Sequence, residues 1–122
     1  MVSVVISIGS NCEDKKAKVE EALIWLKSLL MQTKSSEIYE TPCALKIGNC
    51  YMNAVISGFY QGDGMQLEEI LKEKEKEMGR NEAARKKGEV PIDLDIVILN
   101  NEIVKNWDYR QTFFQIGYRY IK

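Results

Sequence analysis

The chain has 122 residues, of which 45% are hydrophobic and 29% charged, and its net charge is −1. This composition is typical of one folded domain and excludes a disordered chain, while the small net charge provides no overall field for attracting nucleic acid or a membrane surface. The sequence contains no histidine, which excludes histidine-based acid–base catalysis, and its cysteines at positions 12, 43 and 50 have no metal-ligand spacing.

The beginning of the chain predicts the cellular location of the protein. Residues 1–8 lack both the basic start and the cleavage site of a signal peptide. The longest apolar runs are much shorter than a bilayer span. We therefore expect a cytoplasmic protein that contacts neither membrane nor nucleic acid and folds as a single domain over residues 1–122.

The spacing of apolar residues predicts the secondary structure. In chain order, we expect a strand at 2–8, a helix at 14–31, a strand at 33–40, a loop at 43–49, a strand at 50–60, a helix at 65–78, a polar loop at 80–89, a strand at 91–99, a hairpin strand at 102–104 after a turn at 100–101, and a last strand at 113–118. Turn formers at Gly9-Ser10-Asn11 end the first strand. Asp14 is the expected N-cap of the first helix, or Asn11 if that helix begins earlier, and Gly79 is the C-cap of the second.

The order of these elements is β-α-β-β-α-β. It matches the ferredoxin-like α+β fold, in which an antiparallel sheet is covered by two helices on one face.

Two aspartates lie inside the predicted strand at 91–99. Asp93 and Asp95 are two positions apart, so their side chains project to the same face, with Cα atoms about 6.5–7 Å apart. Neighbouring carboxylates repel each other and resist burial unless a cation joins them, and a divalent metal ion is the usual solution. The alternative is that both acids cover the solvated face of an edge strand.

Four cationic residues precede these aspartates in the polar loop, namely Arg80, Arg85, Lys86 and Lys87. Cations beside a carboxylate–metal centre are what a polyphosphate substrate requires, because the metal bridges some phosphate oxygens while the side chains hold the others. The alternative is an ordinary solvated run of charges.

Five short motifs occur in a characteristic order. They are Gly9-Ser10-Asn11, Tyr39-Glu40-Thr41-Pro42, Tyr51-Met52-Asn53-Ala54-Val55, Glu75 with Gly79-Arg80, and Asp93-Leu94-Asp95-Ile96. Asp93 follows Arg80 by thirteen positions. From about residue 4 to residue 104, the chain resembles the 6-hydroxymethyl-7,8-dihydropterin pyrophosphokinase family of folate synthesis.

The resemblance implies an ATP- and Mg²⁺-dependent transfer of pyrophosphate to the hydroxymethyl group of the pterin, with release of AMP. It implies that Asp93 and Asp95 hold two Mg²⁺ ions and that Arg80 acts with them in catalysis. The implied pterin-binding residues are Thr41, Pro42, Tyr51, Asn53 and Phe113. The implied ATP-binding residues are Glu75, Arg80, Arg85, Lys86, Lys87 and Ile96. We expect ATP and the pterin as small-molecule partners, and a monomer or weak dimer.

The chain also departs from the family pattern. Positions where the family carries further arginines and a tryptophan hold Glu82, Lys86, Lys87 and Val90, and the family's Pro-His segment is missing from a short C-terminal part. Loss of one phosphate clamp costs about two to three orders of magnitude in rate. Three hypotheses follow: a slow pyrophosphokinase, a non-catalytic pterin- or nucleotide-binding module, and an interaction domain whose aspartates are surface acids.

Overall fold

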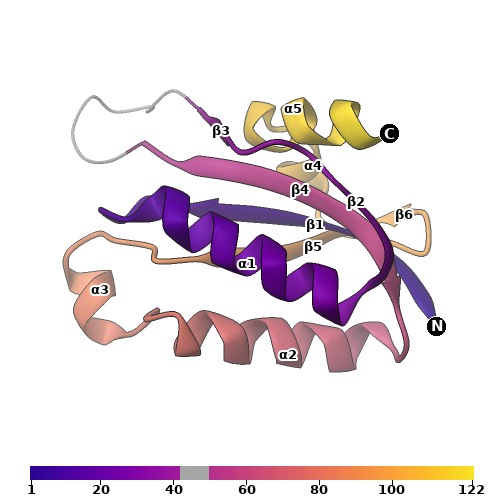
Figure 1. Cartoon of the computed structure of the whole chain (residues 1–122), viewed down its shortest axis with the longest axis horizontal. Helices are drawn as coiled ribbons and strands as arrows, with labels where there is room; N and C mark the ends of the chain where they lie inside the picture. The colour runs from indigo at the N-terminus through magenta and orange to yellow at the C-terminus, as the bar shows by residue number, and fades with distance from the viewer. Residues whose placement is uncertain (42–49) are drawn as a thin grey trace.

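The computed structural model of the chain describes residues 1–41 and 50–122. It contains an antiparallel sheet with helices on both faces (Figure 1). The elements are β1 (Val2–Ser10), α1 (Lys15–Leu29), β2 (Met31–Ser35), β3 (Tyr39–Glu40), β4 (Met52–Tyr60), α2 (Gly64–Glu77), α3 (Glu82–Lys86), β5 (Asp93–Leu99), β6 (Glu102–Ile103), α4 (Asn106–Arg110) and α5 (Thr112–Ile121). The predicted loop at 43–49 and Pro42, one of the expected pterin-binding residues, lie outside the described residues.

The sheet has the strand order β2-β4-β1-β5-β6, and β3 also pairs with β4. All of these pairs are antiparallel. Each of the central strands β1 and β4 connects through a helix to a strand two places away, β1 through α1 to β2 and β4 through α2 to β5. This connectivity is the split βαβ arrangement of the ferredoxin-like fold, which confirms the predicted fold class.

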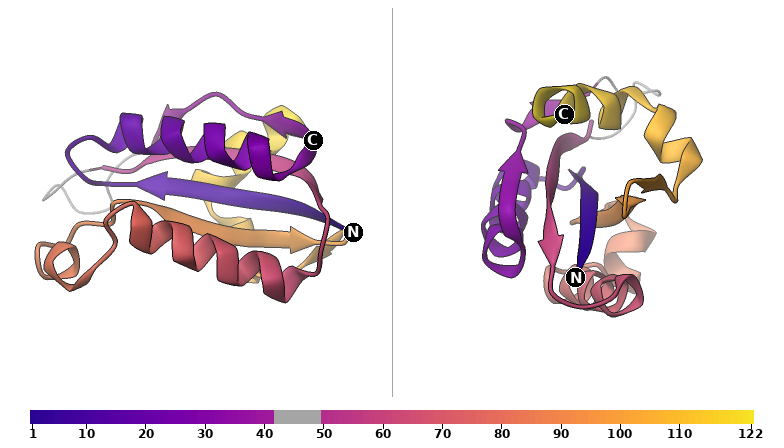
Figure 2. Two further views of the ribbon diagram at one scale, coloured as in Figure 1. Left: turned by 60° about the horizontal axis from the view of Figure 1, so that its bottom comes forward. Right: turned by 90° about the vertical axis from the view of Figure 1, so that its right-hand side faces the viewer.

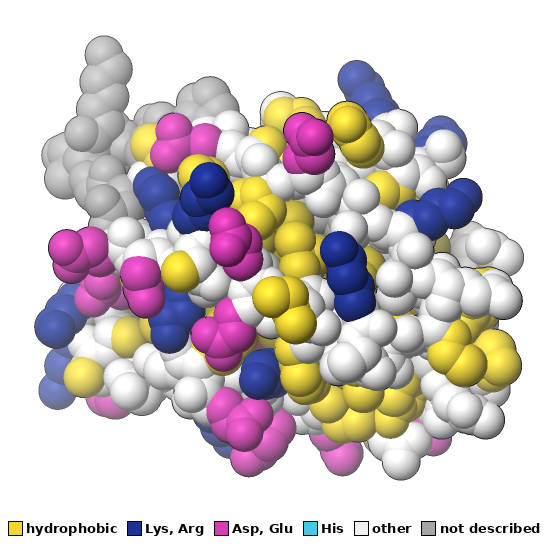
Figure 3. Space-filling model, viewed as in Figure 1, with side chains coloured by type: hydrophobic (Ala, Val, Ile, Leu, Met, Phe, Trp, Pro, Cys, Tyr) yellow, Lys and Arg dark blue, Asp and Glu magenta, His cyan; other side chains and the backbone are white. Residues whose placement is uncertain are grey.

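Helices α1 and α2 run along one face of the sheet (Figure 2). The main core lies between them and the strands, where Ile6, Ile8, Leu26, Leu67 and Leu71 are all fully buried. Spacings of two in the strand and of four in α2 place these side chains on the inner surfaces. Each such burial stabilises the fold by roughly 1.5–3 kcal/mol. Acidic and basic side chains are interspersed over the outer, solvated face of the helices (Figure 3).

Helix α5 covers the other face of the sheet and corrects a prediction. Residues 113–118 were expected to form a strand, but they belong to this helix. Phe114 and Ile121 pack with Val55, Val97 and Ile98 in a second cluster. Phe114, Gly117 and Ile121 are buried at a spacing of three and four residues, which is helical, and the aromatic content of the segment outweighed this signal in the prediction.

Other predicted elements are confirmed with small differences. The expected strand at 33–40 is split into β2 and β3, and the polar loop at 80–89 contains the short helix α3. The side chain of Asn81 caps α3 by accepting a hydrogen bond of 2.9 Å from the Ala84 N–H. The hairpin turn has Asn100 and Asn101 at φ values of 50° and 66°, a conformation that asparagine tolerates well. In the described parts of the chain, no helix is long and apolar enough to cross a membrane.

Candidate functional site

The pairing of three neighbouring strands brings the predicted pterin and metal residues together. Strand β1 lies between β4 and β5, and its Gly9 is the register partner of Asn53 on β4 and of Asp93 on β5. Two residues earlier in β1, Ser7 is the partner of Asp95. Because side chains alternate along a strand, Asn53, Asp93 and Asp95 all project to the face opposite α1 and α2.

Asp93 and Asp95 form a close pair of acids on this face. The neighbouring Ile92 and Leu94 are fully buried on the helical side, which orients both carboxyl groups away from the core. Burial, together with a hydrogen bond to Asp95 and the charge of Asp95, raises the pKa of Asp93 to about 7. Burial also acts on Asp95, but hydrogen bonds from Asp93 and Lys105 outweigh it and lower the pKa of Asp95. Two acids held this close favour a bound cation.

Glu75 links α2 to the edge of β5 and holds Arg80. Its side chain is only 4% exposed, and its Oε2 accepts a hydrogen bond of 2.8 Å from the Leu94 N–H. Its Oε1 lies 3.2 Å from Nη1 of Arg80, and the same nitrogen donates to Oδ1 of Asp93 at 2.9 Å. Glu75 therefore fixes the guanidinium group of Arg80 against Asp93.

Two lysines that the sequence analysis did not include contact Asp95. Lys105 donates a hydrogen bond of 2.6 Å to Oδ1 of Asp95, and Nζ of Lys72 lies 3.6 Å from the same oxygen. Lys72 also lies 3.3 Å from Oε2 of Glu75. The turn at Asn100-Asn101 was a signal for Lys105, because a hairpin returns the following residues alongside β5. The position of Lys72, three residues before Glu75 on α2, was a weaker signal that the two side chains lie side by side.

The predicted pterin-binding residues Thr41, Tyr51 and Asn53 form a hydrogen-bonded group. Asn53 is 2% exposed, and its Nδ2 donates to Thr41 Oγ1 at 2.9 Å and to the Tyr51 carbonyl at 3.3 Å. Burial and the nearby charge of Asp93 raise the pKa of Tyr51, so its phenol stays neutral. A Cβ at Gly9 would lie 3.4 Å from both Asn53 Oδ1 and Tyr51 Cδ2. Gly9 therefore lies within close contact distance of both side chains.

Phe113 lies in the first turn of α5 and is connected to this group through Tyr39. Tyr39 is the register partner of Asn53. Its hydroxyl donates to the Phe113 carbonyl and accepts a hydrogen bond of 3.1 Å from the Gly117 N–H. Burial raises the pKa of Tyr39 to about 12, which keeps this hydroxyl protonated. Tyr39 thus anchors the start of α5 beside the Asn53 end of β4.

The other predicted ATP-binding residues do not join the aspartates. Arg85 is 83% exposed, with Glu82 as a neighbour at 3.9 Å, and Lys86 and Lys87 are also exposed. The side chain of Ile96 is buried in the core under α1 and α2. Any contact from Ile96 to a ligand on the aspartate face must therefore come from its backbone.

Val90 lies where the end of the loop meets the turn after β1. Its carbonyl accepts a hydrogen bond of 3.1 Å from the Asn11 N–H, and its own N–H donates to Asn11 Oδ1. Asn11 Nδ2 also donates to the Gly88 carbonyl at 3.3 Å. A hollow of about 440 Å³ opens here, lined by Arg80, Asn81, Glu82, Arg85, Gly88, Glu89 and Val90.

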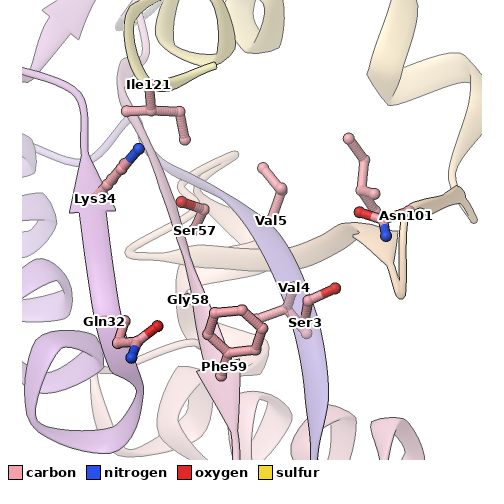
Figure 4. A pocket seen from close by; sticks show the side chains of 11 residues that line it. Ser3, Val4, Val5, Gln32, Lys34, Ser57, Gly58, Phe59, Asn101 and Ile121 are labelled. Atoms are coloured by element: carbon pink, nitrogen blue, oxygen red, sulfur yellow. The ribbon is translucent and has the colours of Figure 1, made fainter.

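A second hollow, of about 420 Å³, lies toward the opposite end of the strands (Figure 4). Ser57, Phe59 and Val5 line its floor, with Ile121 of α5 at its rim. Lys34 is the one charged side chain among its lining residues. This composition lacks the carboxylates of a metal site, so the chemistry concentrates at the Gly9 end of the sheet.

Comparison with known proteins agrees with this geometry. The family model for 7,8-dihydro-6-hydroxymethylpterin-pyrophosphokinase matches residues 5–117, which include both aspartates and Asn53. A folate synthesis bifunctional protein of Arabidopsis thaliana is 38% identical over 96 residues, covering 77% of this chain and 20% of that protein. A second protein from this plant, a mitochondrial folate synthesis bifunctional protein, is 34% identical over 96 residues, covering 77% of this chain and 17% of its own length.

The chain thus spans about a fifth of the length of these relatives. The family model, by contrast, extends over most of the chain, from β1 to α5. On this match, the chain belongs to the 7,8-dihydro-6-hydroxymethylpterin-pyrophosphokinase family.

Proposed function

We propose that the chain transfers pyrophosphate from ATP to the hydroxymethyl group of 6-hydroxymethyl-7,8-dihydropterin and releases AMP. The observation that carries this proposal is the row Asn53–Gly9–Asp93 across three adjacent strands. It sets a buried amide, suited to a hydrogen-bonding heterocycle, next to a pair of carboxyl groups suited to a cation and phosphates.

The pterin is proposed to bind between Asn53, Thr41, Tyr51 and Phe113. Asn53 offers hydrogen-bonding atoms at fixed positions because Thr41 and the Tyr51 backbone hold its amide. Tyr51 is 36% exposed, so part of its ring is open to a ligand. Phe113 contributes an aromatic surface from α5. Rings on which a flat heterocycle stacks, together with a few oriented polar groups, are the usual composition of such a pocket.

The donor set of Asp93 and Asp95 fits magnesium. Mg²⁺ prefers carboxylate oxygens and commonly takes only one or two from the protein, completing its shell with water and substrate phosphates. Within residues 1–41 and 50–122, no cluster of three or more acidic, cysteine or histidine side chains forms a closed metal cage, which agrees with this mode. We propose two Mg²⁺ ions here. When bound, Mg²⁺ neutralises phosphate charge and lowers the pKa of a bound hydroxyl group.

The cations around the aspartates are proposed to hold the remaining phosphate oxygens. Arg80 is fixed by Glu75 and Asp93, and its side chain is still 41% exposed. Lys72 is 42% exposed and lies beside Asp95. In the reaction, the hydroxymethyl oxygen forms a bond to the β-phosphorus and loses its proton. The bond from the β-phosphorus to the oxygen that bridges it to the α-phosphorus breaks, and AMP leaves. Positioning and charge neutralisation account for most catalysis of this kind.

The test measures AMP release from ATP and 6-hydroxymethyl-7,8-dihydropterin, with and without Mg²⁺, for wild type and Asp95→Asn. We expect Mg²⁺-dependent AMP formation that the substitution abolishes. Glu77→Gln is a matched control, because Glu77 is exposed on α2 and the change removes one negative charge. AMP formation that is equal in wild type and Asp95→Asn would contradict the proposed site.

A second candidate function is a binding module that retains the pterin or nucleotide without turning it over. The exposed position of Arg85 and the presence of Val90 near the hollow favour it, because the phosphate-binding side of the site then depends on few cations. Pterin binding measured by calorimetry, with no AMP formed under any condition, would support this function and exclude the first.

A further inference from the structure

Lys105 reaches the aspartate pair because of the hairpin that follows β5. After the turn at Asn100-Asn101, the chain runs back alongside β5, and the Val104 N–H donates to the Val97 carbonyl at 2.9 Å. The Lys105 N–H donates to the same carbonyl at 3.3 Å. Lys105 is therefore anchored through its backbone next to the strand that carries Asp95, and its side chain is 36% exposed.

The side chain of Lys105 makes the shortest contact with Asp95. Its Nζ lies 2.6 Å from Oδ1, whereas Nζ of Lys72 lies 3.6 Å from that oxygen and shares its charge with Glu68 and Glu75. Asp95 is 16% exposed and Lys105 is 36% exposed. The ammonium group thus covers an oxygen of the more deeply placed carboxylate while keeping its own contact with solvent.

We propose that Lys105 is a displaceable counter-ion of Asp95, which competes with a divalent metal ion for this carboxylate and so sets the metal affinity of the site. The inference rests on the proposed function in one respect, because it takes Asp95 as a metal ligand.

Competition follows from the chemistry of the shared oxygen. A carboxylate oxygen that accepts a short, charge-assisted hydrogen bond has less electron density and less space to offer a metal ion. A metal ion and an ammonium group close to one carboxylate also repel each other. Metal binding through Oδ1 of Asp95 therefore requires Lys105 to move away, and the cost of this movement lowers the observed affinity.

The surroundings of Lys105 allow this exchange. The carboxyl groups of Glu68 and Asp108 are the other acids whose charges act on its ammonium group. Asp108 lies three residues further on, in α4, and Glu68 lies on α2. An ammonium group released from Asp95 therefore stays near negative charge.

The test uses Mn²⁺ alone as the probe, with free Mn²⁺ followed by electron paramagnetic resonance in the absence of nucleotide. Lys105→Met removes the charge and keeps most of the apolar stem. We expect it to bind Mn²⁺ about five- to tenfold more tightly than wild type. Lys105→Arg keeps a cation next to Asp95 and is expected to stay within about twofold of wild type. Lys34→Met changes the net charge by the same amount at β2, the opposite edge of the sheet, and is expected to leave Mn²⁺ affinity unchanged.

The outcomes separate this inference from the proposed function. Mn²⁺ binding that Asp95→Asn abolishes and Lys105→Met leaves unchanged or weakens would overturn the role of Lys105 and leave the metal site standing. The absence of Mn²⁺ binding in both wild type and Lys105→Met, with circular dichroism confirming that both are folded, would overturn the inference. It would leave the proposed function to the AMP assay, because Mg²⁺ can also take ligands from substrate phosphates. An equal gain for Lys34→Met would also overturn the inference, because net charge and not position would then explain the effect.

Discussion

The aspartate edge of β5 and the loop between Arg80 and Val90 carry similar kinds of residues, but they hold them differently. At the edge, Arg80, Glu75 and Asp93 form a chain of contacts at 2.9–3.2 Å that connects α2 to the strand. In the loop, Arg85 is 83% exposed and lies 3.9 Å from a carboxylate oxygen of Glu82. The sheet edge is therefore organised before any ligand binds, whereas the loop cations are not.

This difference predicts how the two regions respond to substitution. A preorganised group costs no reorganisation when the substrate arrives, and an exposed long side chain loses rotamer freedom when it is ordered. Arg80 belongs to the first kind, and Arg85, Lys86 and Lys87 belong to the second. We therefore expect substitutions at the edge to cause large losses of the proposed activity or of stability. Substitutions in the loop are expected to change that activity by a smaller factor.

The largest expected effect is on catalysis at the edge. Asp95→Asn keeps the size of the side chain but removes the charge that attracts a cation and pairs with Lys72 and Lys105. We expect the rate of AMP formation to fall by on the order of a thousandfold, a magnitude typical for the loss of one essential electrostatic group. A coupled assay for AMP measures it. A decrease of less than about fivefold would place the catalytic charge elsewhere.

The next effect is on stability, and it tests whether Glu75 organises the edge. Glu75→Gln keeps an acceptor for the Leu94 N–H but replaces the charge that pairs with Arg80 and Lys72. Because the carboxylate is nearly buried, we expect the free energy of unfolding to fall by about 2–3 kcal/mol. Urea denaturation measures this change. Glu77→Gln, on the exposed side of the same helix, is expected to change stability by less than about 0.5 kcal/mol.

Much of this edge could be predicted from local sequence. The period of two along 91–99 correctly placed Asp93 and Asp95 on one face, since that property depends only on strand geometry. Leu67 and Leu71 lie four residues apart in the helix expected at 65–78, a spacing that places them on one face, and both are fully buried. The predicted roles of these and the other site residues in binding and catalysis stay predictions.

The remaining features depend on pairings between distant parts of the chain. Gly9 aligns Asn53 with Asp93 only through the register of three strands, and one sequence does not fix that register. An irregularity in the pairing of β1 with β5 allows both Val97 and Ile98 to pack beneath α5, which no periodic pattern indicates. The helix α5 was misjudged because aromatic residues favour strands locally, while its packing against β4 favours a helix.

A smaller effect is expected from restoring a cation in the loop. The backbone of Val90 is held by Asn11, so its side chain can change without altering the hydrogen bonds. The family resemblance implies an arginine at position 90, which borders the hollow beside Arg80. We expect Val90→Arg to raise the rate of AMP formation about tenfold through a new phosphate contact.

Val90→Met is the matched control for this gain, because it lengthens the side chain without adding charge. It is expected to leave the rate unchanged. If Val90→Arg and Val90→Met behave alike, position 90 does not contact the phosphates, and the loop and the edge work independently.

The last prediction concerns the pH dependence of stability, and it compares the metal-free edge with the unfolded chain. Burial and the nearby Asp95 raise the pKa of Asp93 to about 7, above the value of about 3.9 for an aspartate in an unfolded chain. Between these pH values the folded protein binds more protons than the unfolded one. The free energy of unfolding therefore falls as pH rises from about 4 to about 7, and the contribution of Asp93 is complete only at the acidic end. Asp93→Asn removes this titration, so its free energy of unfolding, measured by urea denaturation at intervals from pH 5 to pH 8, should decline less steeply than that of wild type. Parallel curves for the two proteins would mean that Asp93 titrates alike in the folded and unfolded states. The contact with Arg80 would then offset the effects of burial and of Asp95 on the pKa of Asp93.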